Sequence, residues 1–229
     1  MRRMLRARGL SLKEFSWSFK GVVLVLFLAF PAVSAVQGAM SGKGIFEGRK
    51  CFACHGVATP AKAADEKSGP PLWYAGSKFR AGFLDRWLAN PLPLRPMSYG
   101  SITVENPDNH PRLSEGEAKE VSAYLMALKA KKSKAGIIKA GRGEARSGGI
   151  VFEKKGGCYG CHRIKKDGSV VGGLSGPSLV GAGRRLDRDW IYMYLKDPES
   201  FRPKGMPVYK GILEDKEMRA LAVYLSMQE

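Results

Sequence analysis

The sequence has 229 residues, enough for one large domain or for two domains of about 100 residues each. Hydrophobic residues make up 44% of it and charged residues 26%, which are the proportions of a globular protein and exclude extensive disorder. Four cysteines are too few for a small disulfide-rich scaffold. Lysine and arginine number 38 against 21 acidic residues, a net charge of +17 that any account of the protein's partners must explain.

The amino-terminal 35 residues have the pattern of an export signal. Six basic residues and one acidic residue precede an apolar run that begins at Val22. The run is about fifteen residues long and contains Pro31, so it is short for a membrane span of roughly 20 residues. Small residues up to Ala35 suit cleavage by a signal peptidase. We predict that residues 1–35 are a cleaved signal peptide, with a retained membrane anchor as the alternative. The rest of the chain, still at +12, is then exported.

The exported part contains one pattern twice. The segment CFACH at 51–55 recurs as CYGCH at 158–162, an offset of 107 residues. At the same offset, GPPL at 69–72 recurs as GPSL at 176–179. The repeat predicts two domains.

The predicted domains occupy residues 41–128 and 150–229, and residues 129–149 join them. This connector carries seven basic residues and one acidic residue, and its glycine and alanine content predicts a flexible linker.

The predicted elements are helical in both domains. Apolar side chains at helical spacing predict a helix that ends before Pro91 and an equivalent helix that ends before Pro198. Ser114 and Glu117 form a capping-box pattern, which predicts the start of the last helix of the first domain. No segment shows strand-like alternation of comparable strength. The sequence therefore predicts an all-α fold with a few short helices in each domain.

The repeated Cys-x-x-Cys-His segment has a specific chemical use. Two thiols spaced by two residues add to the vinyl groups of a haem as thioethers, and the histidine that follows is held on one face of the ring, where it ligates the iron. A lone Cys-x-x-Cys also occurs in zinc knuckles, thioredoxin-like redox pairs and disulfides, but two copies with the adjacent histidine argue against these. We predict two covalently attached c-type haems. Their thioether carriers are Cys51, Cys54, Cys158 and Cys161, and the first iron ligands are His55 and His162.

Each iron needs a ligand on its other face, and a methionine follows an Arg-Pro step in both copies. Met97 comes 42 residues after His55, and Met206 comes 44 residues after His162. Histidine with methionine raises the reduction potential and leaves no open position on the iron, which suits electron transfer. We predict Met97 and Met206 as these ligands. The first copy also has a longer loop that contains His110, a competing candidate that we expect to be a solvent-exposed loop residue.

The other repeated residues have supporting roles around a haem. A backbone carbonyl near Pro70 or Pro177 is expected to accept a hydrogen bond from the ligand histidine, which fixes its tautomer. Leu72 and Leu179 are expected to pack against the ring. The aromatic residues expected to pack in the pockets or to donate hydrogen bonds to haem propionates are Trp73, Trp87, Tyr99, Trp190 and Tyr209.

With these motifs, each half resembles a class I cytochrome c. The nearest family is the tandem dihaem cytochromes c of the bacterial periplasm, and the resemblance covers residues 41–128 and 145–228. It implies two haem domains that carry single electrons between respiratory partners, and a periplasmic location. The packing that it implies is Gly44 and Phe46 against Tyr124, and Gly149 and Phe152 against Tyr224.

We therefore predict an electron carrier and not an enzyme. The expected partners are redox proteins, among them a membrane-bound oxidase or quinol-oxidising complex with an acidic docking surface, which the basic charge would steer. Association with a membrane surface and ordinary solubility are other readings of the charge, and nucleic-acid binding is not expected.

One alternative function is a dihaem enzyme of the peroxidase or thiosulfate-oxidising type, for which a labile Met97 would open the iron. The other is the cytochrome subunit of a larger dehydrogenase or quinol-oxidising complex.

Overall fold

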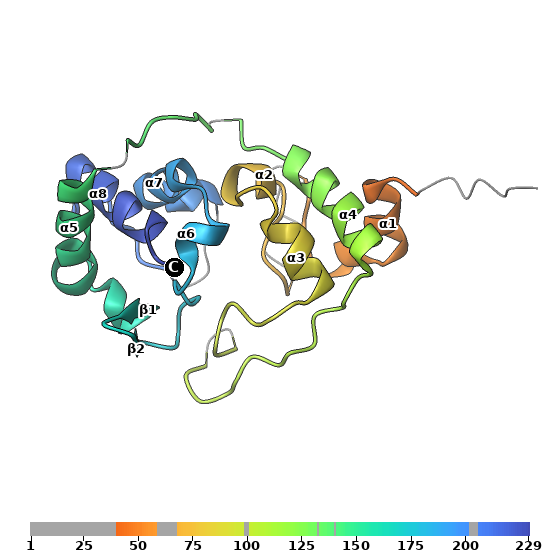
Figure 1. The fold of residues 1–229 in the computed structure, drawn as a ribbon, viewed down its shortest axis with the longest axis horizontal. Coiled ribbons are helices and arrows are strands. Elements are labelled where there is room, and N and C mark those ends of the chain that lie inside the picture. The colour runs from red at the N-terminus through yellow and green to blue at the C-terminus, as the bar shows by residue number, and fades with distance from the viewer. Residues whose placement is uncertain (1–39, 59–67, 99–100, 132, 140, 202–205) are drawn as a thin grey trace, which may run out of the picture. The chain divides into compact units, whose positions relative to one another are not determined.

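The computed structural model describes residues 40–58, 68–98, 101–131, 133–139, 141–201 and 206–229 (Figure 1). The predicted signal peptide and Tyr99 lie outside these residues. Residues 39–229 form a single unit. Within its described part, no helix is both long and apolar enough to cross a membrane.

The first half of this unit is a small helical assembly. Its α4 packs against α1, α2 and α3. Leu84 and Leu88 of α3 and Val121 and Leu125 of α4 are buried there, as their helical spacing predicts. The elements of this half are α1 (Gly42–Gly48), the 3-10 turn η1 (Cys51–Ala53), α2 (Ala75–Lys78), α3 (Phe83–Ala89) and α4 (Glu115–Ala127).

The second half repeats this order of helices. Its last helix, α8, packs against α5, α6 and α7. The predicted helix ends are confirmed, because α3 stops before Pro91 and α7 stops before Pro198. The elements are α5 (Arg142–Ile150), a π-helical turn η3 (Val151–Lys155), η4 (Cys158–Gly160), β1 (Arg163–Lys166), β2 (Ser169–Gly172), α6 (Ala182–Arg185), α7 (Arg188–Lys196), η5 (Pro198–Phe201) and α8 (Asp215–Ser226).

In each half the first helix crosses the last one closely, α1 over α4 and α5 over α8 (Figure 1). A glycine lies at each crossing, because a Cβ on Gly42 would overlap the Glu120 carbonyl and one on Gly148 would overlap the Ala220 carbonyl. The glycines at the crossings are therefore Gly42 and Gly148, and not Gly44, which the resemblance had implied. Gly149 does lie beside Tyr224, as implied, because a Cβ on it would be 3.2 Å from Cε2 of that ring.

The aromatic packing that the resemblance implied is present beside these crossings. The Phe46 and Tyr124 rings have centroids 5.6 Å apart, and those of Phe152 and Tyr224 are 5.7 Å apart.

The predicted capping box at the start of α4 is also present. The backbone N–H of Glu117 donates to Ser114 Oγ at 3.3 Å, and the Ser114 N–H donates to Glu117 Oε2 at 3.0 Å. Arg49, at the end of α1, donates to the same carboxylate through Nη2 at 2.6 Å. One acidic side chain thus caps α4 and ties it to α1.

A β-hairpin in the second half corrects the all-α prediction. Strands β1 and β2 pair antiparallel, with Arg163 opposite Gly172 and Lys166 opposite Ser169. Two residues connect them, Asp167 with φ of 49° and Gly168 with φ of 82°, which is the backbone of a type I′ hairpin turn. An Asp-Gly pair is a strong hairpin signal. The strands are only four residues long and mostly polar, which is why alternation did not reveal them.

The segment predicted to be a flexible linker is partly helical and is held in place. Helix α5 begins at Arg142, within the predicted linker. Upstream of it, the Ala130 N–H donates to Ser77 Oγ at 3.0 Å. The N–H groups of Gly136 and Ile138 donate to the buried Asp189 carboxylate at 2.6 and 2.7 Å. Hydrogen bonds to both halves therefore fix the course of this segment.

The two halves meet through backbone and aromatic contacts. Phe79, just after α2, forms an isolated antiparallel bridge with Leu186, just after α6. Beside it, Trp73 stacks on Phe201 with an interplanar angle of 7°. Contacts of this kind join residues more than a hundred positions apart and make the halves one structural unit.

Candidate haem sites

Both Cys-x-x-Cys-His segments have the same backbone conformation. The residue before each segment is left-handed, with φ of 55° at Lys50 and 61° at Gly157. A 3-10 turn follows, and the histidine N–H bonds back to the first cysteine's carbonyl at 3.0 Å in the first half and 2.9 Å in the second. The two turns therefore present their two thiols and their imidazole in the same way.

The four thiols are unpaired with one another. None of them forms a disulfide, and Cys54 and Cys161 are exposed. Burial raises the pKa of the Cys51 and Cys158 thiols. A thioredoxin-like pair would instead lower the pKa of its attacking thiol. The environment of the first cysteine in each motif thus argues against redox-active thiols.

The imidazole of each motif is oriented by a prolyl carbonyl, as predicted. His55 Nδ1 donates to the Pro70 carbonyl at 2.8 Å, and His162 Nδ1 donates to the Pro177 carbonyl at 2.7 Å. Burial lowers the pKa of both histidines. When a neutral ring donates its proton from Nδ1 in this way, its lone pair is on Nε2, which is the nitrogen that can bind a metal.

The glycine before each of these prolines is required by the ring beside it. A Cβ on Gly69 or on Gly176 would lie 2.6 Å from Cε1 of the motif histidine in its own half. Any side chain at these positions would push the imidazole away. The Gly-Pro-x-Leu segment thus supplies both the space for the ring and the carbonyl that holds it.

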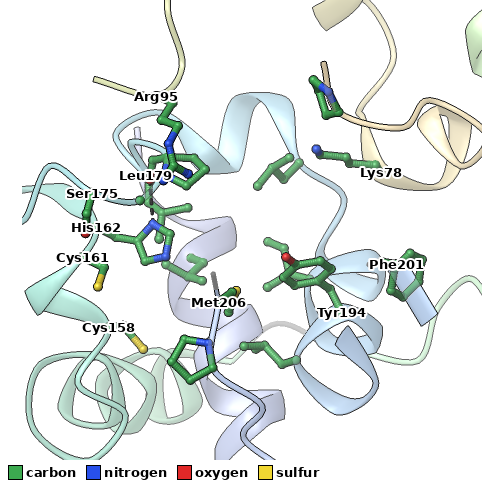
Figure 2. A pocket seen from close by; sticks show the side chains of 18 of the residues that line it. Lys78, Arg95, Cys158, Cys161, His162, Ser175, Leu179, Tyr194, Phe201 and Met206 are labelled. Atoms are coloured by element: carbon green, nitrogen blue, oxygen red, sulfur yellow. Dashed lines mark hydrogen bonds between the residues drawn. The ribbon is translucent and has the colours of Figure 1, made fainter. Parts of the chain in front are cut away.

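A large cavity lies beside the motif of the second half, and residues of the first half, among them Gly69 and Pro70, also border it. The cavity has a volume of about 880 Å³ and is bordered by Cys158, Cys161, His162 and Met206. Figure 2 shows His162 and Met206 extending into this space from different parts of the chain. Most of the remaining wall is apolar or aromatic: Leu179, Leu186, Trp190, Ile191, Tyr194, Leu195, Phe201, Tyr209 and Leu225.

Two observations test whether this cavity fits a haem. The indole Nε1 of Trp190 is buried and has no hydrogen-bond partner within the described residues, so it needs an acceptor from a bound group. Three cations, Lys78, Arg95 and Arg185, border the same cavity, and no acidic side chain is among the described residues that border it. An apolar ring with two carboxylates would satisfy both features, so the residues fit a haem with its propionates.

Burial makes the charged forms of two of these cations, Lys78 and Arg185, less favourable. Burial, together with the charge of Arg185, lowers the pKa of Lys78 to about 8. Burial also lowers the pKa of Arg185 to about 10. Lys78 lies on α2 of the first half, with Nζ 5.2 Å from the Trp190 ring centroid. No pattern in the sequence indicates these residues, because their convergence depends on how the two halves meet.

In the first half the structure brings a different residue to the motif than expected. The His110 ring centroid lies 6.1 Å from that of His55 and 4.6 Å from that of Trp87. His110 is half-buried, so the expectation of a solvent-exposed side chain was wrong. Met97 is also half-buried, but it forms an isolated antiparallel bridge with Glu105 in the long loop. Its role as a ligand remains a prediction.

The fold and the site of the second half are similar to those of a c-type cytochrome domain. In the comparison with protein families, residues 143–225 match the model described as cytochrome C oxidase, cbb3-type, subunit III. The match contains the whole second site, from Cys158 to Met206, and it supports a covalently bound haem c and an electron-transfer role for this half. No curated protein and no solved structure matches the chain.

Proposed function

We propose that the chain is a dihaem c-type cytochrome that passes single electrons between redox partners outside the cytoplasm. The observation that carries the proposal is the repeated site, in which a Cys-x-x-Cys-His turn has its imidazole bonded to a prolyl carbonyl in both halves. A bound haem would supply an iron whose ferric and ferrous states accept and release one electron.

The second site supports a carrier more than an enzyme. His162 and Met206 border one cavity and would occupy both axial positions of the iron. An iron with both positions filled by the protein has no open position for a substrate. The cavity cations Lys78, Arg95 and Arg185 would neutralise the propionates, and Trp190 would donate a hydrogen bond to one of them.

A count of the attached haems tests this proposal. The chain should be matured in a host with a c-type cytochrome assembly system, and its mass measured after denaturation, which retains only covalent haem. Two haems per chain are expected. The matched variants Cys51→Ser with Cys54→Ser, and Cys158→Ser with Cys161→Ser, should each retain one haem. A wild-type chain with a single haem would refute the dihaem proposal.

A second candidate function has support from the family match. The matched model describes a subunit of an oxidase complex, so the chain is also a candidate cytochrome subunit of a larger membrane complex. Purification from its native membrane under mild detergent separates the two functions. A stoichiometric partner would favour the subunit, and recovery of the chain alone would favour a free carrier.

Export and charge complete the proposal. Residues 1–35 would direct the chain to the periplasm, either as a cleaved signal or as a retained anchor, and the amino-terminal residue of the mature protein distinguishes the two. The net charge of +12 on residues 36–229 would steer the carrier toward an acidic docking surface. Its electron-transfer rate with an acidic partner should then fall as ionic strength rises.

A further inference from the structure

We propose that His110 is the axial ligand opposite His55, so that the first haem is held by two histidines and the second by His162 and Met206. This inference rests on the proposed function, because it requires a haem in the first half.

The separation of the two rings matches this arrangement. A metal–imidazole nitrogen bond is about 2.0 Å long, so two imidazoles bound through Nε2 on opposite sides of one metal ion have ring centres about 6 Å apart. The observed distance between the His55 and His110 centroids is 6.1 Å.

In both rings the hydrogen-bonded nitrogen is Nδ1. His110 Nδ1 donates to the Pro111 carbonyl at 3.0 Å, in the same way that His55 Nδ1 donates to the Pro70 carbonyl at 2.8 Å. The sequence has three histidines, and Nδ1 of each is bonded to a prolyl carbonyl, so Nε2 is the nitrogen of each ring that could bind a metal.

The loop that carries His110 is anchored close to this position. Arg112 Nη2 donates to Asn90 Oδ1 at 2.6 Å, and the Leu113 N–H donates to the Leu88 carbonyl at 3.0 Å. These bonds tie the end of the loop to α3, where Trp87 packs against the His110 ring. His110 is therefore positioned by the hydrogen bonds of the residues that follow it and by the packing of its ring against Trp87.

Met97, in contrast, belongs to a loop segment that turns toward the other half. Asn106 donates to the Arg95 and Pro96 carbonyls at 3.0 and 2.8 Å, and Arg95 borders the cavity of the second half. The Leu94 carbonyl accepts the Ser178 N–H at 2.7 Å. Met206 packs against the apolar core, whereas Met97 is not part of that core among the described residues. The two methionines that match in sequence thus have different surroundings.

Two kinds of ligation would give the electron a direction within the chain. A methionine ligand raises the reduction potential of a haem above that of a haem with two histidine ligands. The first haem should then have the lower potential, and an electron that enters at the first half would pass to the second.

The test uses the full dihaem chain and needs no mutation to begin. After two haems per chain are confirmed by mass, the oxidised protein is examined by electron paramagnetic resonance and near-infrared magnetic circular dichroism. We expect two low-spin haems in equal amounts, one with two histidines and one with histidine and methionine. Two histidine–methionine haems would overturn the inference and leave the dihaem proposal intact, whereas a single haem would refute that proposal itself.

Matched variants assign the ligands to residues. Met97→Leu should leave the spectra and both reduction potentials unchanged, and His110→Leu should convert one haem to high spin. His110→Met should convert the bis-histidine signal to a histidine–methionine signal and raise the lower potential. A high-spin haem in Met97→Leu would assign the ligand to Met97 and overturn the inference.

Discussion

Asp189 connects the segment between the two halves to the second half, and its replacement gives the sharpest stability prediction. Asp189 is 7% exposed, and its carboxylate accepts the N–H groups of Gly136 and Ile138 at 2.6 and 2.7 Å. A hydrogen bond to a charged group contributes about 1.5–3 kcal/mol, and removing the acceptor leaves buried donors without a partner. We expect Asp189→Ala to lower the free energy of unfolding by about 3 kcal/mol.

A change of this size lowers the melting temperature by about 6–12 °C in a chain of this length. The assay is urea unfolding of the haem-loaded protein, followed by far-ultraviolet circular dichroism. Asp189→Asn keeps one acceptor oxygen, so it should lower the free energy of unfolding by about half as much as Asp189→Ala. The control is Asp108→Ala, at an exposed loop position, which should change stability by less than about 0.5 kcal/mol.

Hydrogen exchange tests the cause of the loss. The Gly136 and Ile138 amides should exchange slowly in the wild-type protein and fast in Asp189→Ala. If Asp189→Ala were as stable as Asp108→Ala, and both amides exchanged at wild-type rates, the stabilising role of the two hydrogen bonds to Asp189 would be refuted.

Three further predictions concern the sites and the helix pair α1–α4. The Arg49 guanidinium and the capping bonds from Ser114 hold the pKa of Glu117 at about 2, below its ordinary 4.5. The ionised Glu117 carboxylate therefore contributes its full stabilisation above pH 4.5, and this stabilisation is lost as the pH falls toward 2. The difference in melting temperature between wild type and Glu117→Gln should therefore shrink over that range, and a constant difference would contradict it. Gly176→Ala should displace the His162 ring and convert the second haem to high spin, while an unchanged spectrum would contradict the required close approach. Met206→Leu should remove one low-spin histidine–methionine signal, and its retention would show that another residue is the ligand.

Local chemistry explains what could be predicted from the sequence. The Cys-x-x-Cys-His turn, the prolyl carbonyl that each motif histidine contacts and the Ser114 capping box all depend on residues close together in the chain, or on a motif that occurs twice. The type I′ turn at Asp167-Gly168 is equally local, and the Asp-Gly pair was a sufficient signal for it.

The contacts that could not be predicted depend on distant parts of the chain. His110 lies 55 residues after His55, and its position is set by Trp87 and by the Arg112–Asn90 hydrogen bond. An Arg-Pro-Met pattern, by itself, does not show which way its loop turns.

The same reason applies to the cavity of the second half. Lys78 and Arg95 come from the first half and reach this cavity only because the halves meet. Neither residue belongs to a motif, and nothing in their spacing links them to His162.

An optical redox titration of the mature protein tests the central claim most directly, because it follows the potential and the spin state of each haem together. The account predicts two one-electron steps from two low-spin haems, the lower in potential from the first half. A haem that is high-spin in the resting protein would contradict it, since such an iron has an open position and the chain would then be suited to catalysis on a substrate.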